Sequence, residues 1–151
     1  MTTIGVNMQY SIDDLISSYG QGANYPTTQQ WQQLLNGDVS QPLTVLNFFK
    51  LRAQAGTAII DEAMTGEEAF MKYAQTSVPK VDEVGGHFLL RGTVEGSFIG
   101  QDLESWDIIA IGQYPKRENF LALLMDQDYQ QAFKYRQAAV ENQNVFFINT
   151  M

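Results

Sequence analysis

The chain has 151 residues, with 9 Lys and Arg against 17 Asp and Glu, one His and no Cys, and its formal net charge is -8. Without Cys it can form no disulfide scaffold, Cys nucleophile or thiolate metal site, and a Ser–His–Asp arrangement has one candidate base, His87. The acidic balance argues against duplex nucleic acid and anionic membranes as partners, because both are bound through clustered Lys and Arg.

The length fits one domain, and a composition with 44% hydrophobic and 17% charged residues is typical of a globular protein. No stretch approaches the roughly 20 apolar residues that span a membrane. Residues 1–10 lack the positive charge and the apolar block of a secretory signal. We therefore expect a cytoplasmic protein that does not contact a membrane.

Residues 1–42 differ from the rest of the chain, because they contain no Lys or Arg, three acids and a cluster of glutamines. Ser11 is predicted to cap a short helix that ends at Gly20, and Thr27 with Gln30 forms a capping box for a second short helix. Helices this short are marginal on their own. We predict an N-terminal helical arm over residues 1–42 that docks on a domain formed by residues 43–151.

The domain is predicted to follow the order β-α-β-β-α-β. Thr65 and Glu68 form a capping box for a helix to about Val84, and Pro79 inside it either kinks the helix or divides it. The long strand at 87–99 is expected to bend or bulge at Gly92 or Gly96. The other predicted elements are strands at 43–51, 106–114 and 144–149, helices at 116–124 and 128–141, and a turn at 101–105.

Two βαβ-like halves of these lengths predict an α+β fold, a ferredoxin-like sandwich with four antiparallel strands and helices on one face. In the predicted strands, odd-numbered and even-numbered positions point to opposite faces of the sheet, and both carry large apolar residues. One of these two sets is expected under the helices, and the other needs a further cover. The sheet of a second subunit is the most economical cover, so we predict a homodimer. The odd-numbered set is Val45, Phe49, Ile109, Ile111 and Phe147, and the even-numbered set is Leu46, Phe48, Ile108, Ala110 and Ile148.

The second strand carries the best constellation of polar residues. His87, Arg91, Thr93 and Glu95 share one parity, which places an imidazole, a guanidinium, a hydroxyl and a carboxylate on one face. His87 would transfer a proton near neutral pH and Arg91 would bind an anionic group of the ligand. The alternative is a solvated or dimer-facing polar strip in which Arg91 pairs with Glu95 or Asp107.

Five further residues are candidates for the same pocket. Asn47, in an otherwise apolar strand, either binds ligand or bonds a neighbouring backbone group. Asp107 could orient His87 or Arg91, whereas Trp106 takes the opposite face and either lines a pocket or fills the core. Tyr73 and Arg136 lie on inner helix faces. Tyr73 either directs its hydroxyl into the cavity or is a core residue, and Arg136 is either a second anion anchor or pairs with an acid such as Glu141.

Residues 43–150 contain a series of short runs in a fixed order: VLNFFKLR (45–52), GEEAF (66–70) with Tyr73, VGG (84–86), GTVEG (92–96), IG (99–100), SWD (105–107), YPKRENF (114–120), DYQ (128–130) and YR (135–136). In this ordered set the segment resembles the DUF1330 family of the dimeric α/β-barrel (ferredoxin-like) superfamily. The resemblance implies a homodimer whose two sheets form a barrel, with a pocket between sheet and helices, and it implies no agreed activity. Enzymes and plain ligand binders share this fold, so no single activity carries over.

Our leading hypothesis is a homodimeric protein that binds a small anionic or carbonyl compound, with a second copy and this ligand as its only partners. If it is an enzyme, we expect proton-transfer or oxygen chemistry with no cofactor and no tightly bound metal. His87 and Arg91 would then be catalytic, with Asn47 and Tyr73 orienting the ligand. A second hypothesis is a non-enzymatic binding or assembly module that uses the Gln-rich arm with Trp31. A third is haem binding through His87.

Overall fold

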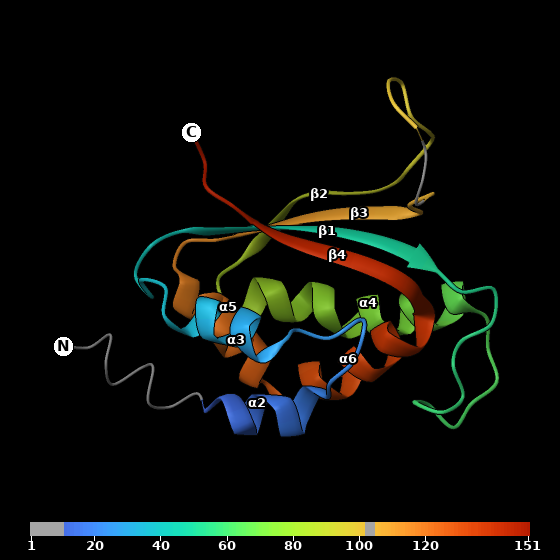
Figure 1. The fold of residues 1–151 in the computed structure, drawn as a ribbon, viewed down its shortest axis with the longest axis horizontal. Coiled ribbons are helices and arrows are strands. Elements are labelled where there is room, and N and C mark those ends of the chain that lie inside the picture. The colour runs from blue at the N-terminus through green and yellow to red at the C-terminus, as the bar shows by residue number, and fades with distance from the viewer. Residues whose placement is uncertain (1–10, 102–104) are drawn as a thin grey trace.

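A four-stranded sheet covered by helices on one side makes up the domain, as the computed structural model shows for residues 11–101 and 105–151 (Figure 1). The strands are β1 (Leu43–Leu51), β2 (His87–Thr93), β3 (Ile108–Tyr114) and β4 (Val140–Ile148). All three strand pairs are antiparallel, in the order β2-β3-β1-β4. This is the ferredoxin-like topology, and it confirms the predicted fold class.

Three helices of the domain lie beneath the sheet: α4 (Gly66–Glu83), α5 (Arg117–Met125) and α6 (Gln127–Ala139). The predicted capping box of α4 is present, because Thr65 Oγ1 accepts from the Glu68 N–H and Glu68 Oε1 accepts from the Thr65 N–H. The helix runs through Pro79 as one element. Local sequence signals therefore place this helix correctly, and Pro79 does not divide it.

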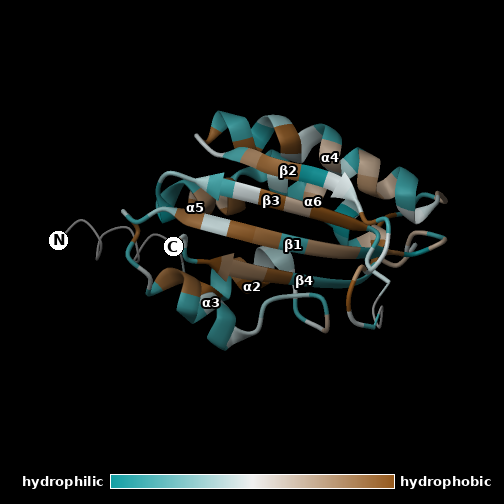
Figure 2. Cartoon of the chain, turned by 90° about the horizontal axis from the view of Figure 1, so that it is seen from above, coloured by the Kyte–Doolittle hydropathy of each residue, from teal (hydrophilic) through white to brown (hydrophobic). Residues whose placement is uncertain are grey.

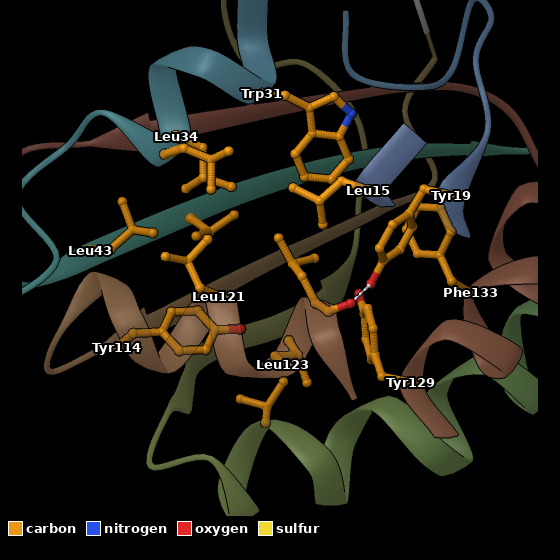
Figure 3. Close-up of a cluster of buried hydrophobic side chains, with 14 of the residues drawn as sticks. Leu15, Tyr19, Trp31, Leu34, Leu43, Tyr114, Leu121, Leu123, Tyr129 and Phe133 are labelled. Carbon is orange, nitrogen blue, oxygen red and sulfur yellow. Dashed lines mark hydrogen bonds between the residues drawn. The ribbon is translucent and has the colours of Figure 1, made fainter. Parts of the chain in front are cut away.

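The N-terminal arm contains two helices, α2 (Ile12–Tyr19) and α3 (Thr28–Leu35), with the predicted caps at Ser11 and Thr27. Their apolar sides enter the main core: Leu15 is 1% exposed and Trp31 3% exposed (Figure 3). The hydroxyl of Tyr19 donates to the Leu124 carbonyl, which ties α2 to the end of α5. The arm is docked on the domain as expected. A domain boundary at residue 42, just before β1, stays a prediction.

The strand register decides which residues face the helices. Antiparallel partners point to the same face, so Val45 and Phe49 share the helix side with their partners Gly112 and Ile108. The prediction that grouped Val45 and Phe49 with Ile109 and Ile111 was therefore wrong. Alternation within one strand shows which of its residues share a face, but it does not show which residues of the neighbouring strand lie on that same face. The open face carries Leu46, Phe48, Lys50, Leu90, Ile109, Ile111, Phe146 and Ile148.

No described helix covers this open face, and Figure 2 views it with the apolar residues of β1 and β3 in brown. Leu90 is 53% exposed, Phe146 47% and Ile148 42%. Both faces of the sheet thus carry apolar residues, although not in the two predicted groupings, and one face has no cover within the described residues.

Some predicted boundaries differ from the structure. β2 ends at Thr93, and its irregularity lies between Phe88 and Leu90 rather than at Gly92 or Gly96. β4 begins at Val140, directly after α6, and so includes Gln143, whereas the predicted strand covers only residues 144–149. Part of the predicted turn at 101–105, residues 102–104, lies outside the described residues.

Candidate functional site

The polar row predicted on β2 is divided by a bulge. Leu89 is an extra residue between the Phe88–Gly112 and Leu90–Ile111 pairs, and one extra residue inverts the alternation of side chains. His87 pairs with Gln113 on the open face, whereas Arg91 pairs with Ala110 on the helix side. The expectation that His87 and Arg91 share a face was therefore wrong.

The residues of this polar row are also exposed to solvent rather than enclosed in a pocket. His87, Arg91, Thr93 and Glu95 are exposed, and β2 is an edge strand. The guanidinium of Arg91 lies 5.3 Å from the ring centroid of Phe88, and among the described residues it forms no ion pair with Glu95 or Asp107. One copy of the chain does not bring His87, Arg91 and Glu95 together into a pocket.

Three further candidates have structural partners. Asn47 Nδ2 donates to the Ala110 carbonyl at 3.0 Å, which is the backbone alternative considered for this amide. Asp107 Oδ2 accepts from the Leu51 N–H at 2.7 Å and so holds the end of β1. Trp106 packs on Phe48 of the open face, with 5.6 Å between ring centroids.

Arg136 and Tyr73, in contrast, come together between the sheet and the helices. Arg136 is only 8% exposed, and its Nη1 donates to Tyr73 Oη at 3.2 Å. Its Nε and Nη2 both donate to Gln143 Oε1, at 2.9 and 2.7 Å. Tyr73 Oη and Tyr129 Oη lie 2.8 Å apart. Helices α4 and α6 and strand β4 thus build one cluster around a buried guanidinium.

The cation in this cluster has no acidic partner among the described residues. Glu141, the acid considered for it, lies 3.6 Å from Lys50 instead. Aromatic rings surround the guanidinium carbon, at 4.7 Å from the centroid of Phe49, 5.1 Å from Phe133 and 5.6 Å from Tyr73. Cation–π contacts and hydrogen bonds to neutral oxygens are therefore what stabilises this charge.

Electrostatics fix the protonation states of the cluster. Burial lowers the pKa of Arg136, but the neighbouring oxygens of Tyr73 and Tyr129 raise it, and the net direction is upward. Burial, followed by the neighbouring Tyr73, raises the pKa of Tyr129 well above its usual value. Near neutral pH Arg136 is therefore charged and the hydroxyl group of Tyr129 is neutral.

The hydroxyl groups of Tyr73 and Tyr129 have two protons to donate, but the structure shows an acceptor for one of them. One hydroxyl proton lies in the hydrogen bond between Tyr73 and Tyr129, while Tyr73 also accepts from Arg136. The second hydroxyl proton has no acceptor within the part of the chain that the structure describes. A guanidinium and a free O–H donor at one place are suited to an anionic oxygen.

A second layer of amides closes the cluster from the arm side. Gln143 Nε2 donates to Gln137 Oε1 at 2.7 Å and to the Asn24 carbonyl at 3.2 Å, and Gln137 Nε2 donates to the same carbonyl at 2.9 Å. Asn24 Nδ2 in turn donates to the Glu141 carbonyl at 3.0 Å. Sequence reasoning missed Gln137, Gln143 and Asn24. Gln137 lies next to Arg136 in the chain, and no local signal marked the other two.

A groove of about 710 Å³ lies elsewhere, between the outer sides of α4 and α6. It contains three lysines, but Lys80 is paired with Asp126 at 3.0 Å and with Asp128 at 3.5 Å. Its polar groups are solvated or paired, so we place the candidate site at Arg136.

Residues 11–101 and 105–151 contain no group of three or more His, Cys, Asp and Glu side chains that could hold a metal ion. None of their helices is long and apolar enough to cross a membrane.

Comparison with known proteins identifies the family of the chain. No curated protein matches the sequence. A crystal structure of a protein of unknown function from Rhodopseudomonas palustris matches with 33% identity over 87% of this chain and 98% of that chain, at a TM-score of 0.77. The methylated form of that protein matches with 31% identity over 86% and 97% of the two chains, also at 0.77.

A hydroxynitrile lyase from Passiflora edulis has 14% identity over 74% of this chain and 97% of that chain, with a TM-score of 0.51, which shows the fold alone. The sequence pattern of a domain of unknown function, DUF1330, matches residues 55–151. The match covers more than half of the chain and agrees with the ferredoxin-like topology. The chain belongs to the DUF1330 family.

Proposed function

We propose that this protein is a homodimer that binds a small molecule through an anionic oxygen, such as a carboxylate, at the guanidinium of Arg136. The observation that carries the proposal is a cation that is 8% exposed and has no acidic partner among the described residues. The rings and neutral oxygens around this charge stabilise it without neutralising it, and a ligand carboxylate would supply the missing counter-charge.

The groups around Arg136 indicate the chemistry of the ligand. The free hydroxyl proton of the Tyr73–Tyr129 pair would donate to the same anion, so Tyr73 keeps its predicted role in orienting the ligand. The rings of Phe49 and Phe133 favour an apolar body next to the charged group. A small aromatic or branched carboxylate meets both requirements.

The predicted roles of His87 as acid–base and Arg91 as anion clamp stay predictions. Since the bulge places these residues on opposite faces of β2, each would need a site on its own face of the sheet. The same holds for the ligand contacts predicted for Glu95, Trp106 and Asp107. We give none of them a part in the Arg136 site.

The dimer is supported by the open face of the sheet. Its exposed apolar side chains lie on the two edge strands, with Leu90 on β2 and Phe146 and Ile148 on β4. An apolar surface of this kind on a soluble domain is a typical protein interface, and a second copy offers the same flat surface in return. The alternative of an arm that recognises a partner has less support, because Trp31 is 3% exposed and packed in the core.

Titration calorimetry with benzoate, phenylacetate and pyruvate tests the ligand proposal, with benzamide as the neutral counterpart of benzoate. A hydrogen bond to a charged group contributes about 1.5–3 kcal/mol, so we expect benzoate to bind about 10- to 150-fold more tightly than benzamide. Arg136→Met should remove this preference. Arg52→Met is the matched control, because Arg52 donates to the Val140 carbonyl outside the cluster.

A loss of binding is informative only if the variant is folded, so the far-UV circular dichroism spectrum of each variant is compared with that of the wild type. If the wild-type protein binds none of the three carboxylates, or if Arg136→Met binds benzoate as the wild type does, the proposed site is wrong.

A further inference from the structure

The candidate site is closed on all sides that the structure describes. Arg136 and Tyr73 are each 8% exposed and Tyr129 is 3% exposed. A ligand can reach the guanidinium only if a neighbouring element moves. Helices α4 and α6 pack against each other, and β4, which carries Gln143, is paired with β1 along the edge of the sheet, so moving any of these elements would disrupt the packing of the sandwich.

The segment between α2 and α3 is held much more lightly. Its residues 21–23 are exposed, Tyr25 packs half-buried against the main core, and the polar contacts with the cluster are the hydrogen bonds of Asn24. Gly20 and Gly22 have φ angles of 107° and 142°, a region that side chains disfavour, so the chain turns at two residues with wide conformational freedom. Residues 20–27 also contain no charged side chain, so they do not repel an approaching anion.

Gln143 connects this segment to the cation. Its Oε1 accepts from Nε and Nη2 of Arg136, and its Nε2 donates to the Asn24 carbonyl. A ligand carboxylate that takes Nε and Nη2 displaces Oε1, because a charged oxygen is the stronger acceptor. The displaced carboxamide then turns away and gives up its bond to Asn24.

We propose that residues 20–27 are the gate of the Arg136 site and that Gln143 couples occupancy of the site to release of the gate. The inference rests on the proposed function, since it concerns access to the same site. The gate is closed in the ligand-free protein by the amide bonds to Asn24. It opens to admit an anion, and it is held less firmly once the anion is bound.

Stopped-flow measurement of benzoate binding tests the gate. Gln137→Leu removes a hydrogen bond to the Asn24 carbonyl and the acceptor that Gln137 Oε1 offers to Gln143 Nε2, so the gate loses part of its hold on both sides. The hydrogen bonds of Arg136 go to Tyr73 and Gln143 and do not involve Gln137. A hydrogen bond contributes about 1 kcal/mol, so the association rate should rise about fivefold. Gln130→Leu is the matched control, because Gln130 lies on the same helix and donates to the Leu124 carbonyl instead. Its association rate should equal that of the wild type.

Hydrogen exchange of the wild-type protein provides a second measurement that needs no variant. Amides of residues 20–27, including the Tyr25 N–H that bonds the Gly22 carbonyl, should exchange faster when benzoate is bound. If benzoate binds but neither the exchange rate of this segment nor the association rate of Gln137→Leu changes, the proposal of a gate is wrong, whereas the proposal of a binding site at Arg136 is unaffected. If none of the carboxylates binds the wild type, the proposed function and the gate both fall.

Discussion

Replacing Gln143 by Glu tests the account of Arg136 in one step. The substitution changes a carboxamide into a carboxylate of nearly the same shape. Gln143 Oε1 already lies 2.9 Å from Nε and 2.7 Å from Nη2 of Arg136. Gln143→Glu would therefore supply the missing counter-charge from within the protein, at the place that we assign to the ligand.

The structure gives the expected size of the effect on stability. The acceptor of two hydrogen bonds from the charged Arg136 becomes a carboxylate, and each bond gains about 1 kcal/mol. The two donations from Gln143 Nε2, to Asn24 and Gln137, are lost at about 1 kcal/mol each. The terms offset one another, so the free energy of unfolding should stay within about 1–2 kcal/mol of the wild type.

Ligand binding should respond very differently. A benzoate ion must displace an internal carboxylate from Arg136, so its affinity should fall by at least about tenfold, the lower end expected for a hydrogen bond to a charged group. Urea unfolding and calorimetric titration with benzoate measure both quantities. The control is Gln130→Glu, which adds the same charge on α6 away from the cluster. Benzoate binding that is unchanged in Gln143→Glu would refute the reasoning.

Three further predictions concern the arm, a pH-dependent contact and the open face. Trp31 is 3% exposed, so Trp31→Ala should lower the free energy of unfolding by about 3–5 kcal/mol; a loss below about 1 kcal/mol in urea titration would mean that the arm is not part of the core. Burial raises the pKa of Asp126, but the Tyr129 backbone N–H and Lys80 lower it, and the net shift is below the usual 3.8. The stability from a depressed carboxyl pKa is present above the usual pKa and is lost as the pH falls through the folded-state pKa, which here lies below 3.8. Asp126→Asn should therefore lower the melting temperature at pH 7 but not at a pH well below the folded-state pKa; an equal loss at both pH values would contradict this. Phe146 is 47% exposed on the open face, so Phe146→Asp should convert the dimer into monomers of 17.0 kDa in light scattering, and a wild-type monomer would contradict the proposed interface.

Local signals in the sequence were sufficient for the helices and for the fold class. The capping boxes at Thr27 and Thr65 depend on residues three positions apart, and the structure shows both. The bulge at Leu89 could not be found in this way, because it is a property of the pairing between β2 and β3 rather than of either strand. A prediction based on alternation alone therefore placed His87 and Arg91 on one face.

The candidate site was predicted only in part for a similar reason. Helical spacing placed Arg136 and Tyr73 on inner faces, and both face the interior. The partners that complete the cluster come from distant parts of the chain, since Asn24 lies 119 positions before Gln143. No pattern within one element reports a contact of that kind, and β4 follows α6 without the turn that would have marked its first residues.

A crystal structure of the protein soaked with 4-bromobenzoate tests the central claim most directly, because the anomalous signal of bromine locates the ligand. The account predicts a carboxylate within hydrogen-bond distance of the Arg136 guanidinium, with Gln143 Oε1 displaced and the bromophenyl ring near Phe49 and Phe133. Bromine sites found only on the surface, with both Gln143–Arg136 bonds intact, would contradict it.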